Sequence, residues 1–336
     1  MASLTTLQKL SIVTASAMFV AMGAVSSAQA FTLSNGPGDG TLTIGVDGYG
    51  SFGSAVGSTT SNAYYDPIGS GTGAGTSFES GVAIRFGNSG QRKFLTSGSI
   101  GGSGYLGNPT VTGTNTSANS SFNYGGLLFN LNQILTPTYT NGVQTGSTLT
   151  QTYNITNTAN TSLSFELLRY LDGDLYFDGS LIDGGGRLVA NGREILFETD
   201  SATGSNTSTT FVGISADGGT IPVVSRYEID SFSGLRSRII AGTALDSTIR
   251  GDGLDADEFI DAGNGYDVTL ALNNLFSLSA GGSTTYTTRT YFGAGTPQSV
   301  ADVPEPASTL GLLALGTIGA GSMLKRKQQK KATLKA

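Results

Sequence analysis

The stretch that decides the fold runs from Leu149 to Tyr170 and reads LTQTYNITNTANTSLSFELLRY. Apolar and polar residues alternate from Leu149 to Ile155 and again from Leu163 to Leu167. An alternation with a period of two is typical of a β-strand that buries one face. A polar segment, Asn160-Thr-Ser162, separates the two runs. We therefore predict two strands that form an antiparallel pair joined by a short polar loop.

The same kind of pattern recurs in the rest of the chain. We predict further strands over residues 41–46, 210–214, 223–229, 267–272 and 284–292. Asn141-Gly142 and Asn191-Gly192 lie between strand-like segments, and an Asn-Gly pair readily supplies the two positive φ angles of a type I′ hairpin. Residues 256–261 are too short and too acidic to predict a helix. No helix is expected outside the two ends of the chain.

Composition agrees with this pattern. The chain has 336 residues, of which 50 are Gly and only 12% are charged, and it is rich in Ser and Thr. Such a composition favours strands joined by turns. The predicted fold class is all-β, an antiparallel β-sandwich ectodomain between an N-terminal signal helix and one C-terminal transmembrane helix. The expected segments are a signal peptide (1–30), a Gly/Ser/Thr-rich β region (31–121), a β-sandwich (122–292), a linker (293–303), a sorting signal (304–327) with a transmembrane helix (307–324), and a basic cytoplasmic tail (328–336).

Two residue types are missing, and their absence excludes many kinds of active site. The chain has no Cys and no His. Disulfides, Cys-ligated metal sites, imidazole metal sites and the Ser-His-Asp and Cys-His catalytic arrangements are therefore excluded. Catalysis would have to rely on carboxylates, hydroxyls, Lys and Arg.

Charge is distributed unevenly along the chain. Between Phe31 and Val303 there are 11 basic and 23 acidic residues. Six of the remaining basic residues follow the apolar run near the C-terminus. A body with this acidic excess does not have the electrostatic footprint of a nucleic-acid-binding protein, so we expect no nucleic-acid partner.

The N-terminus has the order of parts found in a secretory signal peptide. Lys9 precedes an uncharged, largely apolar stretch from Leu10 to Val25, and small residues follow at Ala28 and Ala30. Small residues at these two positions suit a signal peptidase, which we expect to cut after Ala30. The body of the protein is therefore predicted to be exported.

The C-terminus has the order of parts of a membrane anchor. No charge occurs from Pro306 to Leu324, a length close to the roughly 20 residues that a spanning helix needs. A cluster of cations, Lys325, Arg326 and Lys327, follows at once. Basic residues next to a span tend to stay in the cytoplasm, so the body is expected on the outer side. This orientation agrees with the N-terminal signal.

Pro304, Glu305 and Pro306, the apolar run and the cations that follow resemble the PEP-CTERM sorting signal of Gram-negative bacteria and cyanobacteria. The resemblance implies recognition by an exosortase, a membrane transpeptidase that cuts near the tripeptide, and so a transient anchor in the inner membrane before release to the cell surface or the exterior. It also implies an association with exopolysaccharide and biofilm. The two prolines cannot donate to a helix or a sheet, so the tripeptide is expected to be extended and accessible.

Two acidic clusters are the candidate metal sites. Carboxylates spaced by one or two residues in Gly-containing loops can converge on Ca²⁺, which prefers oxygen ligands, although neither cluster has the EF-hand spacing. Solvated loop acids are the alternative interpretation. The candidate ligands are Asp172, Asp174, Asp178, Asp252, Asp255, Asp257 and Asp261. Calcium is the one cofactor considered.

The sequence leads to one main hypothesis and two alternatives. The main one is an exported, exosortase-sorted surface or matrix protein with a structural or adhesive role linked to exopolysaccharide. The first alternative is a calcium- or carbohydrate-binding module of the envelope. The second is a glycan-cleaving enzyme, which needs only two carboxylates. The chain has no Trp on which a sugar would stack, so we expect no enzyme.

Overall fold

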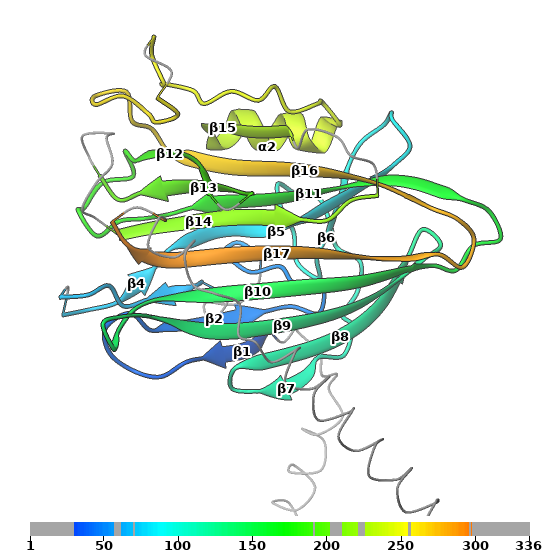
Figure 1. Ribbon diagram of the computed structural model, residues 1–336, viewed down its shortest axis with the longest axis horizontal. Helices are drawn as coiled ribbons and strands as arrows, with labels where there is room; N and C mark the ends of the chain where they lie inside the picture. The colour runs from blue at the N-terminus through cyan, green and yellow to red at the C-terminus, as the bar shows by residue number, and fades with distance from the viewer. Residues whose placement is uncertain are drawn as a thin grey trace, which may run out of the picture. The chain divides into compact units, whose positions relative to one another are not determined.

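The computed structural model describes residues 30–56, 62–69, 71–190, 192–201, 210–220, 226–254, 257–295 and 297, which belong to one compact unit ending at Pro297. Its strands and its helix, all labelled in Figure 1 except β3, have the following bounds: β1 (Phe31–Ser34), β2 (Leu42–Val46), β3 (Tyr64–Tyr65), β4 (Ala74–Gly75), β5 (Ser77–Phe86), β6 (Lys93–Leu95), β7 (Thr112–Thr114), β8 (Ser117–Tyr124), β9 (Leu127–Thr140), β10 (Val143–Asn157), β11 (Leu163–Gly173), β12 (Gly184–Ala190), β13 (Arg193–Thr199), β14 (Thr210–Asp217), β15 (Arg226–Ser231), α2 (Phe232–Ala241), β16 (Val268–Leu278) and β17 (Ser283–Ala294).

The strands form three sheets, in which every pairing is antiparallel. The largest has eight strands in the order β12-β13-β14-β17-β10-β9-β8-β7, and the second has five in the order β15-β16-β11-β5-β6. A small sheet, β1-β2-β3-β4, is built from the first part of the chain. The expectation of an all-β, antiparallel body is therefore confirmed (Figure 1).

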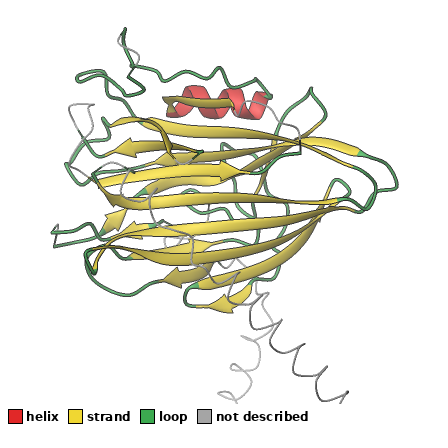
Figure 2. Ribbon diagram, in the orientation of Figure 1, coloured by secondary structure: helices red, strands yellow, loops and turns green. Residues whose placement is uncertain are grey.

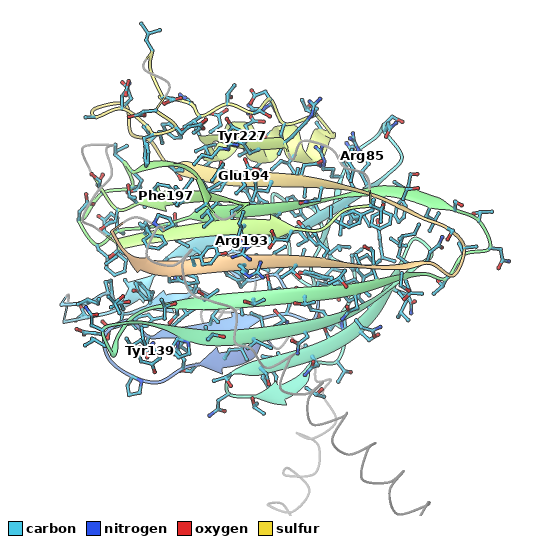
Figure 3. The ribbon with its side chains drawn as sticks, in the orientation of Figure 1. Arg85, Tyr139, Arg193, Glu194, Phe197 and Tyr227 are labelled. Atoms are coloured by element: carbon cyan, nitrogen blue, oxygen red, sulfur yellow. The ribbon has the colours of Figure 1, made fainter. Side chains whose placement is uncertain are left out.

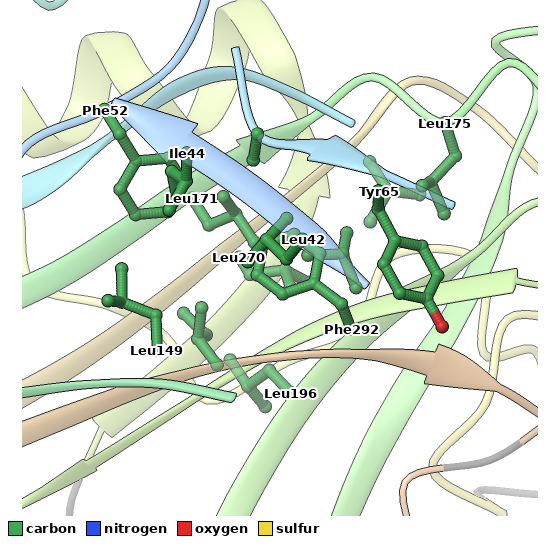
Figure 4. Close-up of a cluster of buried hydrophobic side chains, with 14 of the residues drawn as sticks. Leu42, Ile44, Phe52, Tyr65, Leu149, Leu171, Leu175, Leu196, Leu270 and Phe292 are labelled. Atoms are coloured by element: carbon green, nitrogen blue, oxygen red, sulfur yellow. The ribbon is translucent and has the colours of Figure 1, made fainter. Parts of the chain in front are cut away.

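Apolar side chains fill the space between the sheets. One core cluster joins residues of the eight-stranded and five-stranded sheets, such as Phe129, Tyr286 and Phe276. A second cluster brings Leu42 and Ile44 of the small sheet against residues of both large sheets, including Leu149 and Leu270 (Figure 4). These side chains have almost no exposed surface. Burial of such apolar surface is the main favourable term in holding the layers together.

The two strands of the opening stretch exist, but they do not pair with each other. Residues 149–155 lie within β10, which pairs with β9 and β17. Residues 163–167 lie within β11, which pairs with β5 and β16 in the other large sheet. The predicted antiparallel pair was therefore wrong. The physical reason is burial, because β11 is covered on both faces from Phe165 onward and is the central strand of its own sheet.

The hairpin at Asn141-Gly142 is confirmed. Both residues have positive φ angles, 52° and 81°, and they connect β9 to β10. The second predicted turn joins β12 to β13, whose register pairs Ala190 with Arg193 across a two-residue loop. Strands β14, β16 and β17 coincide with three of the other predicted segments and extend beyond them. The predicted segment 223–229 is described only from residue 226, where β15 begins.

The prediction of no helix within the body was wrong. Helix α2 buries Leu235 and Ile239, which lie one turn apart, against the outer face of the five-stranded sheet. It ends at Gly242, whose φ of 83° is the left-handed conformation that favours glycine after a helix. It is the helix drawn in red in Figure 2, and the described residues contain no other. The described part of residues 256–261 is not helical.

The segments 31–121 and 122–292 share both large sheets. Strand β5 of the first segment pairs with β11, and β8, which crosses the predicted boundary at 121/122, pairs with β9. The linker beyond Pro297, the sorting signal and the basic tail lie outside the described residues, as does the signal peptide except for its last residue, Ala30. Among the described residues there is no helix with the length and apolar character needed to span a bilayer.

Candidate functional site

The first acidic cluster is largely buried. Asp172 ends the regular part of β11 and lies opposite Glu79 of β5 in the register. It is only 1% exposed, and its Oδ2 has no hydrogen-bond partner among the described residues. Burial, and then the nearby charges of Asp267, Glu79 and Asp174, raise the pKa of Asp172 to about 9. Burial and Asp267 raise the pKa of Asp174 to about 6.

A second buried pair, Asp183 and Glu198, adjoins this position, and the sequence did not indicate Glu198. Glu198 of β13 has no exposed surface, and its carboxyl contacts that of Asp183. Burial raises the pKa of Asp183 to about 8 and, together with the charge of Asp183, raises the pKa of Glu198 well above its usual range. A Cβ atom at Gly173 would overlap the Glu198 carboxylate, so the glycine between Asp172 and Asp174 is needed for close approach. The pair can hold a proton at neutral pH.

The structure separates the three predicted ligands of the first cluster. Asp178 lies in an exposed turn, where its Oδ1 accepts a hydrogen bond from the Ser180 amide over 2.9 Å. Asp172 and Asp174 lie instead with Asp267. Across the described ranges, no three acidic side chains are placed to hold one metal ion. Calcium binding stays an alternative hypothesis, which a thermal melt with calcium tests.

The second cluster lies in the loop between α2 and β16. Asp257 Oδ1 accepts a hydrogen bond from the Phe259 amide over 3.0 Å, which is a local turn contact. The carboxylate of Asp261 lies against Gly253, and the Asp261 amide donates to the carbonyl of Gly251 over 2.9 Å. Asp252 has a buried Oδ1. Asp255 lies outside the described residues.

The outer face of the eight-stranded sheet carries an ordered set of polar side chains, which we call the polar face. The register places one row across β8, β9, β10, β17 and β14 and a second row across the first four of these strands. The first row consists of Asn119, Asn132, Thr152, Thr287 and Asp217, and the second of Ser121, Asn130, Asn154 and Thr285. Their neighbours along each strand point into the core, so the face follows from the alternation seen in the sequence.

Hydrogen bonds connect neighbouring side chains of the polar face. Asn132 Nδ2 donates to Asn119 Oδ1 over 2.8 Å, and Thr285 Oγ1 donates to Asn154 Oδ1 over 3.1 Å. Asp217 is the single charged member, and Arg289 pairs with it. Such contacts hold the side chains in defined positions, with further donors and acceptors left for solvent or a ligand.

A groove of about 480 Å³ lies over the small sheet and the turn after β1. Ser34, Thr41 and Thr43 line it, together with Asp66 and Tyr64, whose side chain is 51% exposed. Ser34 and Thr43 are hydrogen-bonded to each other through their hydroxyls over 2.9 Å. An exposed aromatic ring beside hydroxyls is a suitable surface for a sugar ring.

Comparison with known families identifies the C-terminal segment. Residues 302–327 match the model of the PEP-CTERM protein-sorting motif. The chain therefore carries this sorting motif, which contains Pro304, Glu305, Pro306, Lys325, Arg326 and Lys327. The motif marks an exported protein that an exosortase processes. A search of curated proteins finds no match.

Solved structures similar to the body are distant. One is a protein from the human microbiome assigned as a kojibiose phosphorylase, with 10% identity, a TM-score of 0.36, and coverage of 88% of this chain and 33% of that one. Another, from Escherichia coli K12, is assigned as an aldose 1-epimerase, with 12% identity, a TM-score of 0.34, and coverage of 79% and 99%. The chain spans about a third of the length of the first. Likeness at this level carries no functional conclusion.

Proposed function

We propose that this chain is an exported bacterial envelope protein whose β-sandwich has a structural or adhesive role in extracellular polysaccharide. The proposed route is cleavage by signal peptidase after Ala30, transient anchoring in the inner membrane through residues 307–324, and exosortase processing near Pro304-Glu-Pro306. The sorting motif supports the export part of this proposal.

The observation that carries the adhesive part is the polar face. Its hydroxyl and amide side chains can both donate and accept hydrogen bonds, as the hydroxyls of a polysaccharide can. Neighbouring strands lie about 4.8 Å apart, so a row of five strands presents regularly spaced groups over roughly 19 Å. Eight of the nine side chains are uncharged, so the face suits a hydroxyl-rich polymer better than a charged macromolecule.

The groove at Tyr64 offers a second contact for a sugar unit. Stacking on an exposed ring contributes about 0.5–1.5 kcal/mol beyond simple burial. Because Tyr64 lies on the surface and pairs only with the short strands β2 and β4, its replacement should not disturb the large sheets.

The proposed role needs neither an enzyme activity nor a cofactor. The polar face and the Tyr64 groove both support a binding function.

Co-sedimentation tests the adhesive role. The probe is the extracellular polysaccharide extracted from the producing strain, with dextran as a neutral reference polymer. The double variant Thr152→Glu/Thr287→Glu places two charges on the polar face, and Thr110→Glu, in an exposed loop, is the matched control. We expect the double variant to lose most of the bound fraction and the control to keep it. Equal binding by all three proteins would refute the role of the polar face.

A further inference from the structure

A cavity of about 190 Å³ lies at one end of the five-stranded sheet, apart from the polar face and the Tyr64 groove. Three guanidinium groups line it: Arg85 of β5, which is labelled in Figure 3, Arg92 before β6, and Arg226 at the start of β15. Leu245, in the chain that follows α2, forms part of its wall. We call this cavity the arginine pocket.

The arginine pocket is positively charged within an acidic body. Its lining contains three arginines and a single carboxylate, Glu166. Three of the 11 basic residues between Phe31 and Val303 therefore gather at one hollow of a segment that has 23 acidic residues. Like charges repel, and Glu166 supplies one negative charge against three positive ones, so the lining keeps an excess of positive charge that an anion would balance.

The single carboxylate is shared and leaves guanidinium groups available. Arg85 Nε and Arg92 Nε both contact Glu166 Oε1, at 2.7 Å and 2.6 Å. The Nη1 groups of Arg85, Arg92 and Arg226 donate to backbone carbonyls after or at the end of α2. The Nη2 groups of the three arginines have no partner among the residues that the structure describes. Each can still donate two hydrogen bonds.

We propose that the arginine pocket binds the carboxylate of a small organic acid about the size of a hexuronate. A guanidinium group matches the planar geometry of a carboxylate and can donate two parallel hydrogen bonds to it. The apolar wall at Leu245 and Leu275 suits the carbon skeleton of such a molecule better than a bare inorganic ion. At roughly 30 Å³ per water molecule, the volume corresponds to about six waters, which a single sugar ring can displace.

Arg226 is the residue to change, because its replacement leaves the Glu166 contacts of Arg85 and Arg92 in place. Its side chain is exposed, and its Nη1 donates a hydrogen bond to the carbonyl of Leu245 over 3.2 Å. Arg226→Ala removes the guanidinium group. Arg226→Lys keeps the positive charge but lacks the planar group that donates two parallel hydrogen bonds. Arg250→Ala is the matched control, since Arg250 is also exposed and lies at a different site with Asp230.

Isothermal titration of the full chain with sodium glucuronate tests the proposal, with glucose and sodium sulfate as reference ligands. We expect glucuronate to bind, glucose not to bind, and sulfate to bind more weakly. Arg226→Ala should weaken glucuronate binding roughly tenfold, as expected for the loss of one charge-assisted hydrogen-bonded contact, and Arg226→Lys should weaken it less. Arg250→Ala should leave it unchanged. Absence of glucuronate binding, an unchanged affinity in Arg226→Ala, or equal binding of sulfate would overturn the proposal. A failure of the proposed polysaccharide binding by the polar face can be told apart from a failure of this proposal. Polysaccharide binding is measured by co-sedimentation with variants of the eight-stranded sheet, whereas glucuronate binding is measured with variants of the five-stranded sheet.

Discussion

Arg169 and Thr290 connect the two large sheets, because the Nη2 group of Arg169 in β11 donates a hydrogen bond to Oγ1 of Thr290 in β17 over 2.9 Å. Arg169 has no exposed surface, and its Nη1 donates to the carbonyl of Gly81 over 3.1 Å. Burial lowers the pKa of this guanidinium to about 10. A buried cation thus ties the layers together through neutral acceptors.

Replacement of Arg169 should destabilise the fold. Arg169→Ala removes the hydrogen-bond donors to Thr290 Oγ1 and to the Gly81 carbonyl. It also opens a void between the sheets. We expect the free energy of unfolding to fall by about 3 kcal/mol, measured by urea denaturation. The ion pair of the exposed Arg250 with the half-buried Asp230 is the control, and Arg250→Ala should cost only about 1 kcal/mol. Equal effects of the two substitutions would contradict a linking role for Arg169.

Stability should decrease as the pH rises from 5 to 9. The folded-state pKa values of Asp172 and Asp183, about 9 and about 8, lie above the usual value near 4, so the native state holds protons that the unfolded chain releases. The stability that these bound protons contribute is complete below pH 4. It decreases as the pH rises and is lost once the pH passes the folded-state pKa values of about 8 and about 9. Each such carboxyl contributes a slope of at most about 1.4 kcal/mol per pH unit.

Urea unfolding at pH 5, 7 and 9 measures this slope. Asp172→Asn keeps the shape of the side chain and removes its proton equilibrium, so it should flatten the dependence on pH and stabilise the protein at pH 9. A free energy of unfolding that increases from pH 5 to pH 9 would show that these carboxyls are ionised in the native state.

Calcium should have little effect on the melting temperature at pH 7. Ligand carboxylates have to be ionised, whereas burial keeps Asp172 and Asp183 protonated, and Asp178 lies in a separate turn. A thermal melt with and without 5 mM CaCl₂ checks this, since a ligand of the native state must raise the transition. A rise of several degrees that Asp261→Asn or Asp174→Asn abolishes would instead establish calcium binding at that cluster.

Local features of the fold were predictable from the sequence, whereas pairing between distant segments was not. Asn141-Gly142 encodes its own turn, so the β9–β10 hairpin follows from two residues. The alternation in 149–155 and 163–167 predicts two strands but not their partners, because β11 pairs with β5 and β16, which lie far away along the chain. Helix α2 has low-propensity Ser and Gly in its first turns, and only the Leu235 and Ile239 spacing with Gly242 beyond it signalled a helix.

The same limit applies to the candidate sites. The polar face could be anticipated from the Thr and Asn residues that alternate with apolar ones, because alternation assigns them to one face. Glu198 could not, since an acid that directly follows the apolar residues 195–197 does not reveal that Asp183 lies against it. The arginine pocket draws its cations from positions 85, 92 and 226, which only the tertiary fold brings together.

Processing should depend on the sorting tripeptide. With Pro304-Glu-Pro306 replaced by three alanines, we expect a C-terminally tagged chain to keep its tag and to remain in the membrane fraction. The wild-type chain should lose the tag and leave that fraction. Immunoblots of fractionated cells give the result, and a strain without exosortase is the control that should match the variant. Identical processing of wild type and variant would refute exosortase sorting through this tripeptide.

The central claim is that an exported β-sandwich is retained in extracellular polysaccharide through its polar face. The most direct measurement is the fraction of processed chain that stays in the matrix rather than in the medium, compared between wild type and Thr152→Glu/Thr287→Glu. The account predicts that the double variant is exported, folded and processed like the wild type but is released into the medium. Equal matrix retention of the two proteins would contradict it.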